Sequence, residues 1–421
     1  MSSARTWDFR KLPTAAVLSI LCALCFARPC FSYSVIMHEA IVDAEWDNSI
    51  RPFLLHRFPS ATPEELGEAK SYAYGGSVIQ DLGYYPLGSQ FFSHLTHYVR
   101  TGDFVQALFQ ESQDINDYAF ALGALSHYCA DVQGHSVGIN RAVPLLYPKL
   151  RRKYGDIMTW EDSPYAHVLT EFGFDTLEVA AGHVAPQKYH DWIGFRVPKL
   201  VLQRAFRRTY GLELKDQVVS TRLTLAAYRE SASHIIPAMT RVAWALKEKT
   251  LDESAGSVHH KSLFHLRHAD IEASWEKTRT RPGIGDKLTA SIFRLVPKVG
   301  PLDVLQFHPP TDETAQLFAD SLKATIADYE SRIGDPRFDL PAINLDTGQP
   351  IRPGEYRYCD GAFAQLLHKL ELVHFAGTPP ALRDNLLSFY RDTSRNTLRR
   401  KPRHWRRAMR DLKELSAATT K

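Results

Sequence analysis

Along most of the chain, apolar residues recur at intervals of three and four, which is the spacing of one face of an α-helix. Alternating apolar and polar positions, the pattern of a half-buried strand, are scarce. The helical spacing is clearest in five segments: Thr62–Val78, Asp103–Phe109, Asp114–Ala130, Pro198–Thr209 and Val218–Lys247. The pattern therefore predicts an all-α protein whose helices each bury one apolar face.

Short signals predict where some of these helices begin and end. In Thr62–Glu65 a capping hydroxyl is followed by a proline at the first turn and by two acidic residues, which favour the positive end of a helix. Glycine and proline cluster in Gly83–Gly88 and predict a loop between two helices. A polar stretch at Leu251–Val258 predicts a break between two regions, residues 33–250 and residues 251–394.

The second region also shows helical spacing. Its clearest helix is expected over Asp312–Arg332, and another over about Gly361–Phe375. Between them, the stretch Gly334–Glu355 is interrupted by proline and glycine. We therefore expect an additional helical C-terminal region without an internal repeat.

Residues 1–32 have the pattern of a secretory signal peptide. An apolar run over residues 14–26 is too short to span a bilayer as a permanent helix. Small residues at Cys30 and Ser32 fit cleavage before Tyr33. The run follows three cations, Arg5, Arg10 and Lys11. The pattern predicts a secreted or periplasmic protein, and an uncleaved N-terminal anchor is the alternative.

Removal of this peptide lowers the formal net charge from +4 to +1, since four cations and one anion leave with it. A nearly neutral chain gives no argument from bulk charge for binding nucleic acid. Two cysteines remain, Cys129 and Cys359, which are too few for a disulfide framework. The fold must therefore be held by its core, and we expect bound metal to contribute.

The C-terminal tail, residues 395–421, is strongly basic. Trp405 and Met409 are interleaved with its cations, so the tail has the composition of a segment that lies on an anionic membrane surface. A solvated terminal helix is the alternative. These cations include Arg399, Arg400, Lys401, Arg403, Arg406, Arg407 and Arg410.

The strongest chemical signal is a pair of helical motifs with metal-ligand spacing. His127 and Asp131 are four residues apart, so they share one helix face, and His135 follows where Gly134 permits the helix to end. The same spacing recurs at His167 and Glu171. Imidazole nitrogens and carboxylate oxygens are donors that suit zinc.

Further donors precede these motifs, namely His38, Asp81 and either His94 or His97. Together with the two motifs they make eight donors, which exceeds the requirement of one four-coordinate zinc. The number suits two or three ions that share a bridging carboxylate. A single histidine is more often a surface or hydrogen-bonded residue, so the prediction depends on the combination.

The order and the residues of these motifs resemble those of the zinc-dependent phospholipase C family, whose relatives include secreted single-strand-specific nucleases. The run Phe120–Tyr128 followed by Asp131-Val132 resembles the central metal helix of that family, and Ala166–Thr176 resembles its second metal helix. The resemblance covers about Tyr33–Thr176 and implies an all-α domain with three zinc ions.

The resemblance implies a role for each donor. The backbone of Tyr33, as the mature N-terminal residue, and His38 would hold one ion, with Asp131 as the bridging carboxylate. A second ion would bind Asp81, His97 and His127. A third would bind His135, His167 and Glu171. His97 is preferred to His94 because Tyr98 follows it, and the spacing from Asp131 to His135 is shorter than in the best-known members.

The implied chemistry is attack of a metal-activated water on a phosphodiester. Zinc lowers the pKa of bound water to about 7, and two neighbouring ions stabilise charge on the phosphoryl oxygens. The resemblance assigns Asp81 to orienting or deprotonating this water. Nearby cations depress the pKa of a carboxyl group and make it a weak base, so the ligand role of Asp81 ranks above its base role.

Three functions remain open on the sequence. The first is a secreted zinc-dependent hydrolase of phospholipids, and the second is a single-strand nuclease with the same chemistry. A nuclease needs a basic groove, for which Lys149–Lys153 is the candidate patch. The third is a non-catalytic helical protein with structural metal. No protein partner is predicted.

Overall fold

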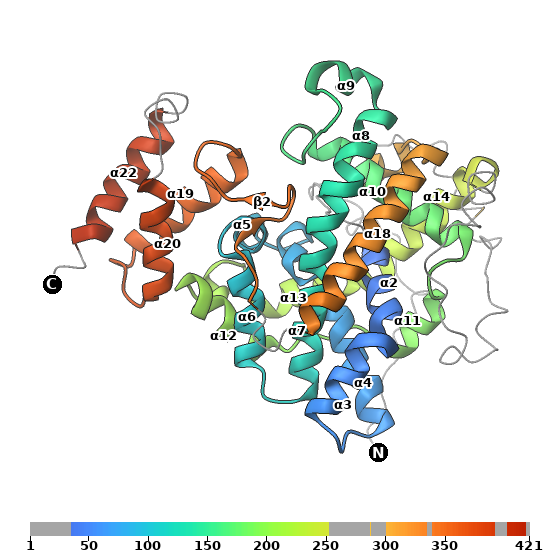
Figure 1. Cartoon of the computed structure of the whole chain (residues 1–421), viewed down its shortest axis with the longest axis horizontal. Coiled ribbons are helices and arrows are strands. Elements are labelled where there is room, and N and C mark those ends of the chain that lie inside the picture. Colours follow the sequence, from blue (N-terminus) through green and yellow to red (C-terminus); the bar gives the residue numbers. More distant parts are fainter. Residues whose placement is uncertain (1–34, 252–286, 288–299, 335–338, 392–401, 418–421) are drawn as a thin grey trace, which may run out of the picture.

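The computed structural model describes residues 35–251, 287, 300–334, 339–391 and 402–417. This part of the chain is almost entirely helical (Figure 1), which confirms the predicted all-α class. The described strands are two short ones, β1 (Ile343–Asn344) and β2 (Gln349–Pro350), which pair as an antiparallel hairpin. Among the described helices, none combines the length and the apolar character needed to cross a bilayer. The expected signal peptide and Tyr33 lie outside the described residues.

The helices before the predicted break include a long one, α7, that packs against several of the others. In chain order they are α2 (Val35–Glu45), α3 (Arg51–Arg57), α4 (Pro63–Gly76), α5 (Gln90–Tyr98), α6 (Thr101–Glu111), α7 (Ile115–Gln133), α8 (Asn140–Leu146), α9 (Pro148–Tyr154), α10 (Pro164–Ala181), α11 (Gln187–Ile193), α12 (Lys199–Tyr210), α13 (Thr221–Glu230) and α14 (Ile236–Leu246). Short 3₁₀ and π turns complete this region: η2 (Trp46–Ile50), η3 (Ile79–Tyr84), η4 (Gly134–Ile139), η5 (Leu214–Asp216) and η6 (Ser231–Ile235).

Helix α4 begins as its sequence predicts. The Thr62 hydroxyl accepts a hydrogen bond from the backbone N–H of Glu65, and the Glu65 carboxylate accepts one from the backbone N–H of Thr62 at 2.8 Å. This reciprocal pair satisfies two N–H groups that the first helical turn would otherwise leave without partners. The predicted start is confirmed.

Helices α4 and α7 cross closely because glycine lies at the contact on both. A Cβ atom on Gly123 would lie 2.0 Å from the Ala73 carbonyl oxygen, and one on Gly76 would lie 2.0 Å from that of Phe120. The contact is therefore backbone against backbone. It places the end of α4, where Ser77 and η3 follow, directly against the centre of α7.

The C-terminal region packs onto the same body. Its elements are η7 (Gly300–Gln306), α18 (Asp312–Ile333), the β1–β2 hairpin, α19 (Arg357–Glu371), α20 (Pro380–Arg391) and α22 (Pro402–Ala417). Helix α18 lies along α7 and η4 (Figure 1), and the Tyr329 hydroxyl donates to the Leu122 carbonyl oxygen at 3.3 Å. The largest buried apolar cluster contains residues of both regions.

Two expected helices have different limits in the structure. The helix expected over Gly361–Phe375 begins earlier, at Arg357, and ends at Glu371. It ends there because His374 and Phe375 adopt φ angles of 51° and 58°, in the left-handed region that cannot continue an α-helix. In the basic tail, α22 covers residues 402–417, while residues 395–401 lie outside the described part.

Candidate metal centre

Helix α7 carries the centre of the site. His127 and Asp131 face the same side of this helix, as their spacing predicts, and both are fully buried. Nε2 of His127 lies 3.1 Å from Oδ2 of Asp131. Helix α5 brings Nε2 of His97 to 3.1 Å from the same oxygen and to 3.3 Å from Oδ1 of Asp81, which comes from η3. Asp81, His97 and His127 each offer one donor atom, and these atoms lie within 4.8 Å of one another.

A second group of donors shares two residues of α7. His38 on α2 joins His127 and Asp131 within the same 4.8 Å limit. The rings of His38 and His127 stack with centroids 4.4 Å apart, and Nε2 of His38 lies 3.7 Å from Oδ1 of Asp131. The two oxygens of Asp131 therefore face different imidazoles, which is the geometry of a carboxylate that bridges two ions.

Backbone carbonyl groups fix the orientation of the imidazoles. Nδ1 of His97 lies 2.7 Å from the Ser93 carbonyl oxygen, and Nδ1 of His127 lies 2.9 Å from that of Ser77. Since a carbonyl oxygen only accepts hydrogen bonds, Nδ1 carries the proton and Nε2 presents a lone pair to the site. Such outer hydrogen bonds set the tautomer of metal-binding histidines.

The predicted third set is less tightly gathered. His135 on η4 and His167 and Glu171 on α10 are all buried, and the two rings lie nearly parallel with centroids 6.2 Å apart. Among the described residues, however, these three do not form a group whose donors all lie within 4.8 Å. Asp131 lies on α7, whereas His135 lies on the π turn η4 that follows this helix. The short sequence spacing between the two residues thus coincides with a change of helix type.

The choice between the two histidines of α5 follows from their positions. His97 lies among the donors, whereas His94 contacts the rings of Tyr84, Tyr98 and Tyr358. Burial lowers the pKa of His94 to about 4, so it is a neutral aromatic contact at pH 7. The structure places His97, and not His94, in the donor cluster.

Comparison with known proteins identifies the region that holds these donors. Residues 37–217 match the model of a family described as zinc dependent phospholipase C. This part of the chain is similar to the zinc-dependent phospholipase C family. The comparisons found no match among curated proteins and none among solved structures. All the predicted donors from His38 to Glu171 lie inside the matched stretch.

The donors in the matched stretch fit zinc on electrostatic grounds. Both carboxylate oxygens of Glu171 are buried without a hydrogen-bond partner, and burial raises its pKa well above the usual range. An ionised carboxylate is buried at an acceptable free-energy cost only beside a cation. Burial also lowers the pKa of His167 to about 3, which keeps its imidazole neutral, as a metal ligand must be.

The bridging position of Asp131 has its own electrostatic signature. Burial alone would raise its pKa, but the charges and hydrogen bonds of His127 and His97 outweigh burial and lower the pKa well below the usual range. Burial raises the pKa of Asp81, which lies on η3. Asp131 is therefore the carboxylate that this cluster most strongly keeps ionised.

Three residues near the donors were not predicted. Asn140, the first residue of α8, brings Oδ1 to 3.1 Å from Nε2 of His167. Its Nδ2 donates to the backbone carbonyl oxygen of Asp346, 206 residues along the chain, at 2.8 Å. The ring of Trp160 lies against that of His167, with centroids 5.9 Å apart. An amide is an uncommon zinc ligand and no local spacing links residue 346 to residue 140, so the sequence carried no signal for this group.

A buried polar network holds α2, the helix that carries His38. His190 on α11 lies between two carboxylates of α2, with Nδ1 2.8 Å from Oε2 of Glu39 and Nε2 3.1 Å from Oδ2 of Asp43. Nζ of Lys70 on α4 lies 2.8 Å from Oδ1 of Asp43. Burial lowers the pKa of His190, but Glu39 and Asp43 outweigh burial and raise it to about 10. The network therefore fixes α2 by charge against α4 and α11.

The start of α2 is fixed by a separate contact. Oδ2 of Asp175 on α10 accepts a hydrogen bond from the backbone N–H of Ile36 at 3.2 Å. Asp175 lies one turn beyond Glu171, so α10 contacts both the predicted third set and the beginning of the described chain. Helix α10 therefore connects the predicted third set of donors to the helix that carries His38.

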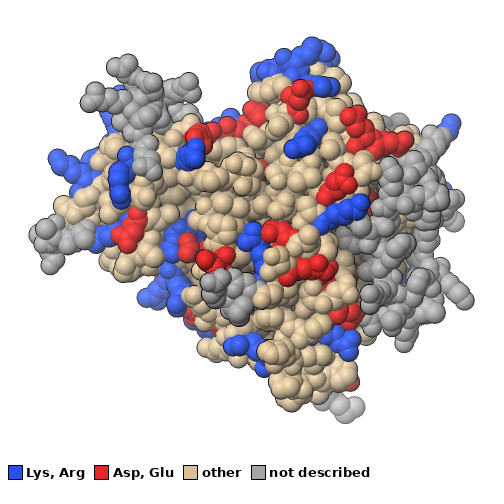
Figure 2. Space-filling model, viewed as in Figure 1, with Lys and Arg blue, Asp and Glu red and all other residues tan. Residues whose placement is uncertain are grey.

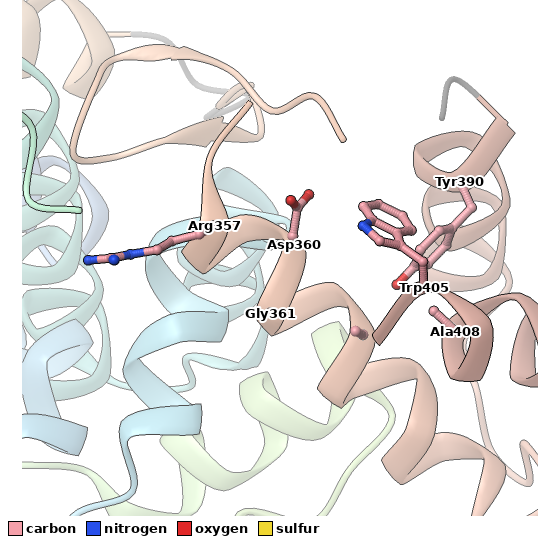
Figure 3. A pocket seen from close by; sticks show the side chains of 7 residues that line it. Arg357, Asp360, Gly361, Tyr390, Trp405 and Ala408 are labelled. Atoms are coloured by element: carbon pink, nitrogen blue, oxygen red, sulfur yellow. The ribbon is translucent and has the colours of Figure 1, made fainter. Parts of the chain in front are cut away.

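Two features of the C-terminal helices lie apart from these donors. His368, Glu371 and Asp411 also meet the 4.8 Å limit, but Asp411 pairs with Arg410, so the group helps to neutralise the basic α22. A cavity of about 70 Å³ lies among α19, α20 and α22 (Figure 3). It is lined by Arg357, Asp360, Gly361, Ala364, Tyr390, Trp405 and Ala408, none of which is a predicted donor.

Proposed function

We propose that this protein is a secreted zinc-dependent phosphodiesterase that hydrolyses phospholipids in the manner of a phospholipase C. The observation that supports it most is the position of Asp131. Its two carboxylate oxygens face separate buried imidazoles, His38 on one side and His97 with His127 on the other. This arrangement lies within the stretch that matches the phospholipase C family.

The residues of the site have distinct roles in the proposed reaction. Bound zinc supplies a hydroxide at neutral pH and stabilises charge on the phosphoryl oxygens. Asp131 would hold two ions, one at each of its carboxylate oxygens. His97 and His127 direct Nε2 into the site, since their Nδ1 atoms are committed to backbone carbonyl oxygens. Asp81 lies beside His97 as a ligand, and its orientation of the attacking water is a secondary role.

Aromatic rings limit the access of water to the donors. Tyr84 lies against His97, with ring centroids 6.0 Å apart, and against Trp160, with centroids 6.3 Å apart. Both side chains are buried. A site with few competing waters strengthens the attraction between metal ions and phosphate oxygens, because the local dielectric constant is low.

The basic helix α22 supports a lipid substrate. Its buried side includes Trp405, Ala408 and Leu415, while Arg406, Arg407, Arg410 and Lys413 are exposed on the other side. We propose that this exposed side makes peripheral contact with anionic lipid surfaces. Each cation near such a surface contributes about 1 kcal/mol of attraction.

A nuclease is the second candidate, and α9 favours it. This short helix has no buried residue and carries Lys149, Arg151, Arg152 and Lys153. Figure 2 shows the Lys and Arg side chains gathered at the tip of the molecule that α9 forms in Figure 1. Such a patch suits a phosphate backbone, although the nearly neutral mature chain does not add a general attraction for nucleic acid.

One set of measurements on the purified secreted protein separates these functions. We expect two to three zinc ions per chain by elemental mass spectrometry, and Tyr33 as the N-terminal residue. We expect release of phosphocholine from phosphatidylcholine vesicles and no cleavage of single-stranded DNA. Cleavage of DNA alone would establish the nuclease instead. Bound zinc with neither activity would support a structural role, and a zinc-free active protein would refute the proposal.

A further inference from the structure

Asn140 and His167 meet through two atoms that both carry lone pairs. Oδ1 of Asn140 lies 3.1 Å from Nε2 of His167, and both residues are buried. Nδ1 of His167 lies 3.1 Å from the Ser163 carbonyl oxygen, which is also an acceptor. A neutral imidazole has one N–H group. One of these two contacts therefore brings two lone pairs together unless a cation lies between them.

The amide of Asn140 cannot relieve this conflict by turning over. Its Nδ2 donates to the Asp346 carbonyl oxygen at 2.8 Å. With oxygen and nitrogen exchanged, Nδ2 could donate to His167, but Oδ1 would then face the carbonyl oxygen of Asp346. Both orientations leave one pair of acceptors in contact. The orientation that keeps the bond to Asp346 directs Oδ1 toward His167 and the predicted third ion.

The backbone holds Asn140 firmly in this place. Its carbonyl oxygen accepts a hydrogen bond from the Met158 N–H at 2.8 Å. Asn140 directly follows the π turn η4 and lies five residues after His135. The backbone N–H of Asn140 donates to the His135 carbonyl oxygen, the five-residue hydrogen bond of a π turn, which places Asn140 about one turn along from His135. His135 and Asn140 can therefore face the same site.

We propose that Oδ1 of Asn140 is a zinc ligand, which shares the third ion with Nε2 of His167 and the carboxylate of Glu171. This inference deepens the proposed function, because it depends on a zinc centre in this domain. Zinc bonds to nitrogen and oxygen are about 2.0–2.2 Å long, so two ligand atoms on one ion lie roughly 3–3.5 Å apart. The observed separation of 3.1 Å meets this requirement.

The same arrangement gives the C-terminal region a role at the site. Asp346 lies at the turn of the β1–β2 hairpin, and its carboxylate accepts hydrogen bonds from the hydroxyl groups of Tyr98 at 2.7 Å and Tyr356 at 2.5 Å. These bonds hold the carbonyl group that orients Asn140. Asp346 is therefore a positioning residue for the amide, and residues beyond the matched stretch of the family complete the metal centre.

The test compares metal binding in Asn140→Ala and Asn140→Asp with the unchanged protein. Zinc per chain is counted after dialysis against a weak chelator, and the visible absorption of the cobalt-substituted protein reports the ligands. We expect Asn140→Ala to lose about one zinc per chain, or to release it at least about tenfold faster. Asn140→Asp, which keeps an oxygen donor, should retain the zinc but show shifted cobalt bands.

Thr209→Val is the matched control. The buried Thr209 hydroxyl on α12 donates to the Ala205 carbonyl oxygen at 2.8 Å, so this variant removes a buried hydrogen bond on a helix that carries no predicted donor. It should keep its full zinc content. The inference is overturned if Asn140→Ala keeps its zinc, if the cobalt spectrum of Asn140→Asp matches the unchanged protein, or if Thr209→Val loses as much zinc.

These readouts do not depend on the substrate. A protein that binds zinc and ignores phospholipid would refute the proposed function and leave the role of Asn140 intact. Conversely, an active phospholipase whose zinc content and cobalt spectrum are unaffected by both substitutions at Asn140 would refute only this inference.

Discussion

At the scale of single residues, the site depends on the buried carboxylate of Asp131, which contacts several of the predicted donors. Asp131 lies within 3.1 Å of both His97 and His127 and faces His38 with its other oxygen. Removing its charge leaves three buried imidazoles without their common partner. The cost should therefore appear in metal binding as well as in activity, because in the proposed site this carboxylate serves more than one ion.

We predict that Asp131→Asn loses both bound zinc and activity. The loss of phosphodiesterase activity should exceed the roughly 10- to 100-fold that removal of an outer-shell partner causes. Zinc content and turnover are measured on the same preparation. Asp117→Asn, near the exposed start of the same helix, is the control and should keep both. Retained turnover in Asp131→Asn would refute the bridging assignment.

Some residues of the site could be predicted from the sequence, and others could not. His127 with Asp131 and His167 with Glu171 are four residues apart on one helix, so local periodicity is enough to place each pair on a common face. Asn140 and Asp346 meet only through the tertiary fold, and neither has the chemistry expected of a zinc site. The predicted metal roles of all these residues remain predictions until metal is measured.

At the scale of elements, the crossing of α4 and α7 positions the donors. Glycine at the contact lets the Ser77 carbonyl oxygen reach Nδ1 of His127. Helix starts such as the one at Thr62 could be predicted because capping is local chemistry. The end of α19 could not, since its final turn depends on the left-handed backbone of His374 and Phe375, which are not glycine.

We predict that Gly123→Ala lowers the free energy of unfolding by about 1–3 kcal/mol, as overpacking does. Its Cβ would lie 2.0 Å from the Ala73 carbonyl oxygen, so the two helices must separate. Gly67→Ala on α4 is the matched control, because nothing lies within 4 Å of its Cβ. It should be neutral or stabilising by up to about 1 kcal/mol, since alanine favours a helix. Denaturant unfolding measures both, and equal effects would contradict the close crossing.

The network that anchors α2 predicts a dependence of stability on pH. Glu39 and Asp43 raise the pKa of His190 to about 10, against about 6.5 in an unfolded chain. Protonated His190 therefore stabilises the fold. This contribution is complete below about pH 6.5 and is lost as the pH rises through about 10. The difference in free energy of unfolding between the unchanged protein and His190→Gln should therefore shrink from pH 7 to pH 10. A difference that stays constant over this range would show that His190 is not protonated in the fold.

At the scale of the whole molecule, the stretch that matches the family is shorter than the part of the chain that shares the largest buried core. The match ends at residue 217, yet the largest buried apolar cluster includes Tyr329, Leu345 and Phe363. The sequence predicted a break near Leu251 from its polar composition. It could not show that α18 returns to lie along α7, because that contact joins segments distant in the chain.

We predict that a chain ending at residue 250 does not unfold cooperatively, because it leaves the faces that contact α18 and the hairpin open to water. Thermal unfolding followed by circular dichroism, with binding of a hydrophobic dye, measures this. A chain that ends at residue 391 is the comparison. It keeps α18, the hairpin and α19, so it should still unfold cooperatively, at a lower temperature than the full chain because α19 loses its contact with α22. Cooperative unfolding of the shorter fragment at the full-length temperature would contradict the shared core.

The dependence of Asn140 on Asp346 has a consequence for the order of events during synthesis. The ribosome completes the histidine-bearing helices long before it reaches the hairpin, so a nascent chain holds its donors without the carbonyl group that orients Asn140. The third ion can then bind with Asn140 in place only after the ribosome has reached the last fifth of the chain. In the exported protein that we propose, this delay favours loading of the ion after the chain has left the compartment where it was made.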